Sequence, residues 1–227
     1  MNLIRSDENL RFGGGNNLAL KRTLAEGFDY ALLMNNDTVV ESDFLTQLVN
    51  LAEADDKIGM TGPKMYYYKP DNVIWFAGGK VNMTFARMRH YGIGEVEKGQ
   101  HGKIREVNFL NGACVLIKRK LLEDIGLFDE DFFLYGEDLD LCLRAYKKGY
   151  KLMYQPRARI YHKVSRSSSP LKKLVYRYQS WLRLMRKHTP FYVRPLQYAN
   201  LIGEFIPLVI GYLLRKIRFH KSGGKWI

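Results

Sequence analysis

The sequence contains little cysteine and no long apolar run. Its 227 residues include only two cysteines, Cys114 and Cys142, too few for a disulfide scaffold or a four-thiolate zinc site. Both lie in apolar runs, so we expect them to be small buried hydrophobes, which fits a reducing compartment. Residues 1–10 have no apolar core, so no signal peptide is expected. No stretch reaches the roughly 18 to 20 apolar residues of a spanning helix.

Acidic residues are nearly absent from the last third of the chain. From Lys147 to Ile227 there are 19 Lys and Arg against one acid, Glu204, a net charge of +18. Residues 1–146 hold 17 basic and 22 acidic residues, a net charge of −5. With 46% hydrophobic residues the chain can bury a core, which excludes global disorder. The basic end suits nucleic acid, anionic lipid or a phosphorylated substrate.

The body of the chain alternates between helical and strand-like patterns. A glycine loop and a helix come first, and a strand over 29–34 follows. We then expect helices at Asp43–Ala54 (Ser42 as its N-cap), Arg119–Ile125 and Glu137–Lys148, and strands at Ile58–Thr61, Val73–Phe76, Val107–Leu110, Ala113–Ile117 and Tyr150–Tyr154. This rhythm predicts an α/β domain with a mainly parallel sheet and helices on both faces.

The pattern changes after residue 165. A linker-like Ser-Arg-Ser-Ser-Ser-Pro stretch spans Ser165–Pro170, and long basic helices are predicted at Leu171–His188 and Leu196–Phe219. We therefore expect two parts, a domain over 1–165 and a basic amphipathic helical tail over 170–227.

A glycine-rich segment stands near the start of the chain. It comprises Gly13, Gly14, Gly15, Asn16 and Asn17. Glycines permit close approach of a phosphate, and the following helix offers free N–H groups to an anion. The Walker and dinucleotide spacings are both absent, so a structural turn explains the segment equally well.

A polar cluster, Asn35-Asn36-Asp37-Thr38, ends the strand at 29–34. Ligands collect at the carboxyl ends of strands in such sheets. Asp37 could bind a divalent cation, with Asn35 pointing to the same side of an extended chain. A strand-to-helix turn is the alternative reading, since Asn, Asp and Thr all favour turns.

The densest motif is the acidic and aromatic segment Gly126–Arg144. On the predicted helix, Asp138 heads a face whose other members are Leu141, Cys142 and Ala145. A carboxylate at an apolar edge has a raised pKa, which suits a general base. Glu137 and Asp140 can be read as acids that complement the helix dipole, and Asp140 can pair with Arg144. Further along, a lone His162 follows a strand-like stretch, and such a histidine is more often structural than a ligand.

Together these segments resemble the family 2 glycosyltransferases, especially the rhamnosyltransferase-like bacterial members. The matching text is NLRFGGGNN from Asn9, YALLMNNDT from Tyr30, VNFLNGACVLI from Val107, GLFDEDFFLYGEDLDLCLR from Gly126 and ARIYHKVS from Ala158. Each motif is weak alone, whereas five in order are specific. The resemblance runs from about Asn9 to His188.

The resemblance implies an inverting nucleotide-diphospho-sugar transferase of GT-A type. It implies Asp138 as catalytic base, and Asp37, Asn35 and His162 as the residues that bind Mn²⁺ or Mg²⁺. It also implies a pocket for the donor or acceptor, formed by Gly13, Gly14, Gly15, Asn16, Asn17, Asn35, Asn36, Asn111, Gly112, Ala113 and Glu137. The donor would be a nucleotide sugar, with dTDP-rhamnose expected first, and the acceptor a glycan or a lipid-linked glycan in polysaccharide or cell-wall synthesis.

The resemblance also shows one departure. Relatives begin with a Val/Ile-rich strand, a helix and a second strand that hold the base and ribose, and residues 1–6 supply at most an edge strand. We therefore expect this chain to lack that first portion and to bind the donor poorly.

Two other classes of function remain open. The basic tail, with Tyr176, Tyr178 and Trp181, could bind nucleic acid, or the chain could be an inactive remnant of the transferase fold. The tail mixes Leu, Ile and Val with its basic residues at helical spacing, which equally suits an anionic membrane surface. We expect a cytoplasmic protein, attached peripherally to the inner face of the membrane through the tail, without a nucleic-acid partner.

Overall fold

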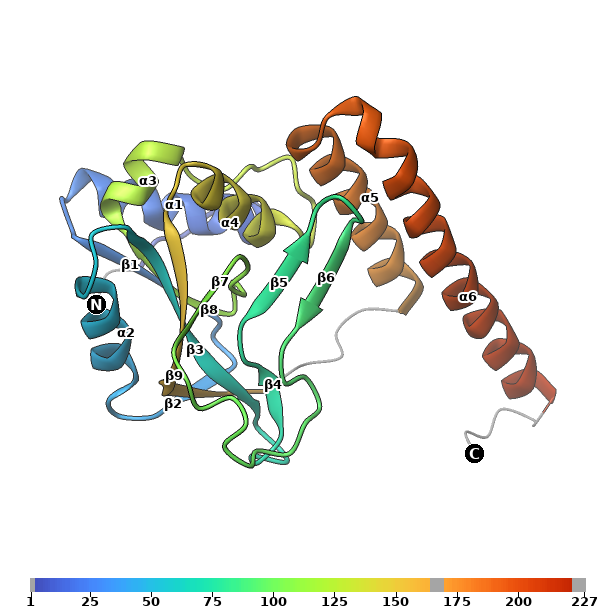
Figure 1. Ribbon diagram of the computed structural model, residues 1–227, viewed down its shortest axis with the longest axis horizontal. Helices are drawn as coiled ribbons and strands as arrows, with labels where there is room; N and C mark the ends of the chain where they lie inside the picture. Colours follow the sequence, from blue (N-terminus) through green and yellow to red (C-terminus); the bar gives the residue numbers. More distant parts are fainter. Residues whose placement is uncertain (1–2, 164–169, 222–227) are drawn as a thin grey trace. The chain divides into compact units, whose positions relative to one another are not determined.

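The computed structural model describes residues 3–163 and 170–221 of the chain (Figure 1). Two compact units divide it: Met1–Val81 with Met88–Ser167, and Asn82–Arg87 with Ser168–Ile227. The predicted linker at Ser165–Pro170 lies almost entirely outside the described residues. The short segment Asn82–Arg87 groups with the C-terminal residues, which no local sequence pattern indicated.

A seven-stranded mixed sheet forms the centre of the first unit. Its main path runs β1–β8–β3–β9–β2, with β4 paired to β3 and β7 paired to β9. The strands are β1 (Tyr30–Met34), β2 (Thr38–Val40), β3 (Ile58–Tyr67), β4 (Ile74–Phe76), β7 (Arg105–Val107), β8 (Cys114–Lys118) and β9 (Lys151–His162). A separate pair joins β5 (Gly79–Asn82) and β6 (Arg87–His90).

The expectation of a mainly parallel sheet is wrong. Among the described strands, β3 and β9 are the only parallel neighbours, whereas β8 lies antiparallel between β1 and β3, and β2 is antiparallel to β9. Because β8 is antiparallel to both of its neighbours, β1 and β3 run in the same direction, and so does β9. The carboxyl ends of these three strands therefore meet at one edge of the sheet, as the site prediction requires.

Four helices pack against this sheet. They are α1 (Arg11–Ala25), α2 (Phe44–Glu53), α3 (Arg119–Ile125) and α4 (Glu137–Lys147). α2 contacts β3 and β9, α4 contacts β9, and α1 contacts β1. Apolar side chains fill the layers between them, with Leu48, Met65, Phe76 and Leu141 almost completely buried. Burial of this apolar surface stabilises the unit.

Several strand boundaries differ from those predicted. β3 continues through Gly62-Pro63, where the sequence suggested an end, and β9 runs to His162 rather than stopping at Tyr154. β7 begins and ends earlier than the strand expected at Val107–Leu110. The N-cap of α2 is Asp43 and not Ser42, and it caps without a side-chain hydrogen bond.

The pairing of β9 with β3 contains an irregularity. Gln155 is opposite Pro63, but the next aligned pair is Arg159 with Lys64. Residues 156–158 therefore have no aligned partner on β3. Beyond them the pairing resumes and brings His162 opposite Tyr67.

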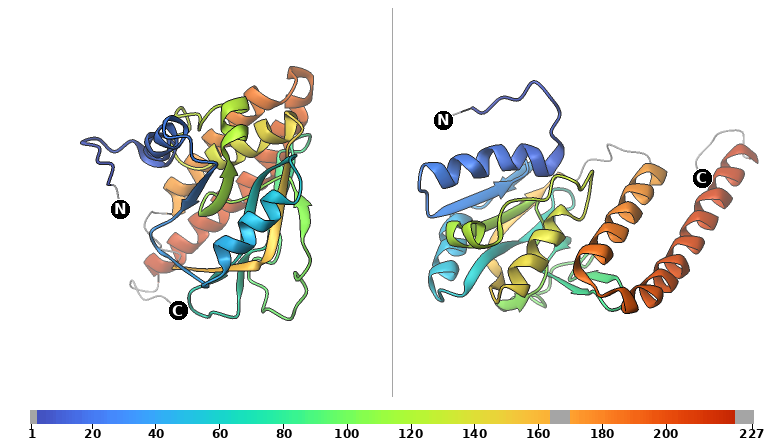
Figure 2. Two further views of the ribbon diagram at one scale, coloured as in Figure 1. Left: turned by 90° about the vertical axis from the view of Figure 1, so that its left-hand side faces the viewer. Right: turned by 90° about the horizontal axis from the view of Figure 1, so that it is seen from above.

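The second unit is built on a helical hairpin. α5 (Pro170–His188) and α6 (Arg194–Lys221) are joined by the short 3-10 helix η1 (Phe191–Val193) and lie side by side (Figure 2). The ring of Tyr178 on α5 lies 4.2 Å from that of Phe205 on α6, measured between centroids. Gln197 is completely buried and donates to the backbone oxygen of Met83, which lies in the short segment of the same unit.

Candidate active site at the carboxyl edge of the sheet

Asp37 is held in a tight connection between β1 and β2. The backbone N–H of Asn35 donates to the carbonyl of Ala113 (2.9 Å), and the Thr38 hydroxyl closes the turn by donating to the carbonyl of Asn35 (2.7 Å). Asn36 at the tip is exposed. The segment is therefore a turn, and at the same time it displays a carboxylate at the strand end. The turn expected from the sequence is present, but it joins β1 to β2 and not a strand to a helix.

Strand pairing brings His162 to this carboxylate. Thr38 is paired with His162 in the β2–β9 ladder, and the N–H of Lys163 donates to the carbonyl of Asp37 (2.9 Å). As a result, Nε2 of His162 lies 3.0 Å from Oδ1 of Asp37, although the two residues are far apart in sequence. His162 is only 7% exposed, and its ring packs edge-on to that of Trp75.

The chemistry of this pair fits a divalent cation. Oδ1 of Asp37 is buried and has Nε2 of His162 as its contact, whereas Nδ1 of His162 is buried without a hydrogen bond. Carboxylate oxygen and imidazole nitrogen are suitable ligands for Mn²⁺. Within the described residues no group of three or more His, Cys, Asp or Glu side chains could hold a metal ion. Asp37 and His162 would therefore supply part of a coordination shell, which phosphate oxygens can complete.

Asp138 lies at the first turn of α4, behind a strained backbone. Tyr135 (φ 68°) and Gly136 (φ 91°) are both left-handed, and Gly136 is the N-cap of the helix. Such a conformation is costly for a tyrosine and is typical of functional sites. The predicted apolar face is confirmed, since Leu141, Cys142 and Ala145 are buried.

The carboxylate of Asp138 is positioned by backbone N–H groups. Gly112 donates to Oδ2 (3.2 Å) and Leu139 to Oδ1 (2.8 Å). Burial raises the pKa of Asp138 above its usual value, although these two hydrogen bonds act in the opposite direction. A base with a raised pKa holds an abstracted proton more readily.

Glu137 is buried, whereas Asp138 is half-buried, and the burial of Glu137 was not expected of a simple helix-start acid. Its side chain is 6% exposed, and its Oε2 is buried without a hydrogen bond. Burial first, and then the neighbouring charge of Asp138, raise the pKa of Glu137 to about 7. The two acids thus form an interacting pair.

Gly112 links the two parts of the site. Gly112 belongs to the segment Asn111–Ala113, which directly precedes β8. Cys114 of β8 is paired with Met34 at the end of β1. Asn111 turns this segment, because its side-chain oxygen accepts from the N–H of Ala113 (2.9 Å). A Cβ atom at Gly112 would lie 2.9 Å from Cζ of Phe12, so a larger residue would require the Phe12 ring to move. Backbone contacts therefore run continuously from the Asp37 turn to Asp138.

The glycine segment at Gly13–Asn17 is not a loop, and this prediction is wrong. These residues belong to α1, which begins at Arg11. Gly13 and Gly14 are buried against the 128–130 segment, where a Cβ would meet Phe128 and Glu130, while Gly15 has open space around it. Asn16 donates to the backbone of its own helix.

Asn17 has a structural role that the sequence did not reveal. It is 3% exposed, and its side chain donates to the carbonyl of Phe128 (3.0 Å) and accepts from the N–H of Phe128 (2.9 Å). Its amide also donates to Glu130 (2.8 Å). Both N–H groups of its amide are used within the protein, so Asn17 positions the acidic motif.

Asp140 is also more than a dipole-complementing acid. It is completely buried, and Arg144 Nε lies 2.8 Å from its Oδ2, so the pair predicted from the sequence is confirmed. Arg144 donates further to the carbonyls of Ile125 and Leu127. The ion pair therefore fixes the chain between α3 and α4, just upstream of the strained turn.

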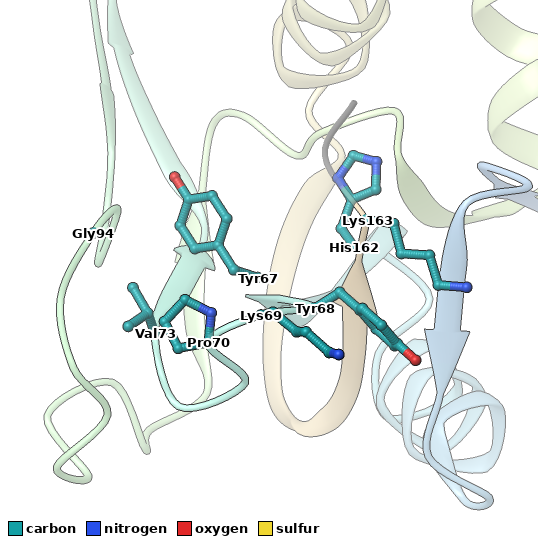
Figure 3. A pocket seen from close by; sticks show the side chains of 8 residues that line it. All are labelled: Tyr67, Tyr68, Lys69, Pro70, Val73, Gly94, His162 and Lys163. Carbon is teal, nitrogen blue, oxygen red and sulfur yellow. The ribbon is translucent and has the colours of Figure 1, made fainter. Parts of the chain in front are cut away.

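A pocket of about 630 Å³ opens beside His162 at the same edge of the sheet (Figure 3). It is lined by Tyr67, Tyr68, Lys69, Pro70, Val73, Gly94, His162 and Lys163. The ammonium group of Lys163 lies 4.7 Å from the centroid of the Tyr68 ring. Of these lining residues only His162 was predicted from the sequence. The available signal was a tyrosine- and lysine-rich segment directly after an apolar strand.

Comparison with known proteins identifies the family. The model of the "Glycosyltransferase like family 2" matches residues 2–183. An N-acetylglucosaminyl-diphospho-decaprenol L-rhamnosyltransferase of Mycobacterium tuberculosis is 33% identical over 98 residues, covering 42% of this chain and 32% of that protein. The O-antigen biosynthesis protein RfbC of Myxococcus xanthus is 31% identical over 158 residues, which are 67% of this chain and 12% of that protein. The chain thus spans less than a third of the length of these relatives.

A solved structure supports the fold. The mannosyltransferase PcManGT of Pyrobaculum calidifontis, determined with GDP-Man and Mn²⁺, superposes with a TM-score of 0.52. It is 16% identical, and the match covers 88% of this chain and 51% of that one. The family match over most of the sequence and this likeness of fold agree with the five motifs. The chain belongs to the glycosyltransferase-like family 2 and has a GT-A type fold.

Proposed function

We propose that this chain transfers a sugar, with inversion, from a nucleotide-diphospho-sugar to a hydroxyl group of a glycan or lipid-linked glycan acceptor. The observation that carries the proposal is the backbone-linked arrangement of the Asp37–His162 pair and Asp138 along one edge of the sheet. Rhamnose is the first donor sugar to test, because the Mycobacterium tuberculosis relative is named a rhamnosyltransferase.

In the proposed reaction Asp138 acts as the general base. Its carboxylate accepts the proton of the acceptor hydroxyl while the hydroxyl oxygen forms a bond to the anomeric carbon. The bond from that carbon to the diphosphate breaks, and its electron pair leaves with the nucleoside diphosphate. Attack from the face opposite the leaving group inverts the configuration. The N–H groups of Gly112 and Leu139 hold the carboxylate in place.

Asp37 and His162 would hold Mn²⁺ or Mg²⁺. When bound, such an ion supplies positive charge that stabilises the departing diphosphate. Lys69 and Lys163, which line the adjacent pocket, add positive charge on the protein side. The pocket volume also suits a ligand of sugar-nucleotide size.

A cytoplasmic location is part of the proposal. Cys114 and Cys142 are both free and buried, and burial raises the pKa of Cys114 to about 12. Such thiols are unreactive and need no oxidising environment, which supports a reducing compartment.

The experiment is a nucleotide-release assay on the full chain. Purified protein is incubated with dTDP-rhamnose and MnCl₂, with or without EDTA, and dTDP release is measured for wild type and for Asp138→Asn. Release that requires manganese and is lost in the variant supports the proposal. Equal release from wild type and variant would show that Asp138 is not the base. Absence of release with a panel of nucleotide sugars would oppose a transferase function of this chain.

A further inference from the structure

One face of α6 is apolar and exposed along four turns. Tyr198, Ile202, Ile206 and Ile210 follow at four-residue intervals, so their side chains form a stripe along the helix. The three isoleucines are each at least 50% exposed. The same face also contains Pro195, Leu196, Ala199 and Gly203, all of them exposed. We call these eight residues the α6 stripe, and none of them is charged.

The hairpin itself does not cover this stripe. α6 packs on α5 through a different side, where Leu201 is buried and its carbonyl accepts from the Tyr178 hydroxyl. Glu204 also lies off the stripe, with Oε1 3.7 Å from Nε of Arg87. Single exposed apolar residues are common, whereas a continuous exposed row usually marks an interaction surface.

Aromatic and basic residues border the stripe along the chain. Phe191 and Tyr192 in η1, just before α6, are more than 70% exposed. Arg186 and Lys187 precede them and are exposed, and Arg215, Lys216 and Arg218 follow the stripe in the sequence. Exposed aromatic rings and cations around an apolar helix face are typical of helices that lie in the interface of a bilayer.

Charge distinguishes between the classes of partner. Residues 170–227, which contain the stripe, hold 12 Lys and Arg and one acid, a net charge of +11. A second copy packed on this stripe would bring two such segments together, which is unfavourable. Nucleic acid would contact the basic residues but would leave the uncharged row uncovered. An anionic lipid surface can contact both the apolar stripe and the basic residues, because acyl chains accept the isoleucines and headgroups attract the cations. Among the described residues no helix is long and apolar enough to cross a bilayer.

We infer that the α6 stripe inserts into the surface of an anionic membrane, with α6 lying parallel to the plane of the bilayer and Phe191 and Tyr192 at the headgroup level. The attachment is independent of the proposed sugar transfer, so each can fail without the other.

The test is flotation of the full chain with lipid vesicles, measured without any sugar donor. Vesicles of phosphatidylcholine with one third phosphatidylglycerol are compared with vesicles of phosphatidylcholine alone. Ile206→Glu places a charge in the centre of the stripe. Val175→Glu is the matched control, because Val175 is an exposed apolar residue on α5 outside the stripe. Circular dichroism and size-exclusion chromatography check the fold and the oligomeric state of each protein.

We expect the wild type and Val175→Glu to float with the anionic vesicles and to detach as salt is raised. Ile206→Glu should bind them at least about tenfold more weakly, because a carboxylate is costly in the interface. Equal binding by both variants would overturn the inference. So would a wild-type chain that stays unbound at low salt, that binds only duplex DNA, or that forms a dimer which Ile206→Glu dissociates.

Discussion

Nε2 of His162 lies 3.0 Å from Oδ1 of Asp37, and this distance is set by the antiparallel pairing of two strand ends. Taken alone, Asp37 is explained as an acid in a turn and His162 as a buried structural histidine. Their contact at the strand ends, in a buried place, turns two weak sequence signals into a specific candidate for binding a cation.

Removing the carboxylate of this pair should abolish metal-dependent nucleotide binding. For Asp37→Ala we expect the manganese-dependent part of dTDP affinity to disappear, while the thermal transition changes little. Isothermal titration with and without MnCl₂ measures this. Asp56→Ala, which removes an exposed acid between α2 and β3, is the control. Equal manganese dependence in Asp37→Ala and wild type would contradict the assignment.

The two acids at the start of α4 should contribute unequally to catalysis. Asp138→Asn keeps the shape and the hydrogen bond from Gly112 but removes the proton acceptor, so turnover should fall by about 10²–10⁴-fold. Glu137→Gln should lower turnover less. Donor binding should be nearly unchanged in both. Steady-state kinetics decide, and a larger defect in Glu137→Gln would move the base to that residue.

Glu137 should make the stability of the fold depend on pH. Its pKa is about 7 in the folded chain and about 4.5 when exposed, so the folded state favours the protonated acid. The stabilisation is fully present below about pH 4.5 and is lost as the pH rises through 7. In Glu137→Gln this dependence is removed, so the stability of the variant relative to wild type should rise by roughly 1–3 kcal/mol between pH 5 and pH 8.

Urea denaturation at the two pH values measures that difference. Glu53→Gln, a substitution of an exposed glutamate at the end of α2, provides the comparison and should show no such gain. A relative stability of Glu137→Gln that is the same at pH 5 and pH 8 would mean that Glu137 titrates normally.

Asn17 should be a stability residue and not a donor-binding residue. Asn17→Ala leaves the N–H and carbonyl of Phe128 without their partner in a buried place, which should cost about 1–3 kcal/mol. Asn16→Ala, which loses only a bond within its own helix, should cost less. The free energy of unfolding is measured in urea for both. If Asn17→Ala instead keeps its stability and raises the KM for the donor, the original sequence-based role would be right.

Local patterns predicted most elements of the fold. The bounds of α3 match, and those of α4 differ by one residue, because apolar spacing and the following Gly126 and Gly149 define both helices. The position of β8 between β1 and β3 was not predictable from such patterns, since antiparallel and parallel partners have the same local sequence. The result was a sheet described as mainly parallel that is in fact mixed.

The site was predicted in part, for a related reason. Asp37, Asp138 and His162 were selected because a family resemblance joined motifs far apart in sequence, and the structure places Asp37 beside His162. Their roles stay predictions. The helical state of Gly13–Asn17 was missed because glycine disfavours helices, and close packing of Gly13 and Gly14 on the 128–130 segment outweighs that preference. The burial of Glu137 depends on tertiary contacts that a single segment does not record.

The unmatched residues 156–158 of β9 have a consequence for how such a site can change. They separate a first half, Lys151–Gln155, which pairs within the core, from a second half that ends at His162. Side chains alternate between the two faces along a strand. Inserting or deleting one residue there would therefore move every side chain of the second half to the opposite face and leave the first half unchanged. A neighbour of His162 would then face Asp37, while the pairing of the core half stayed the same. Residues 156–158 are therefore a place where evolution or engineering can change which residue lies beside Asp37 without altering the strand pairing of the core.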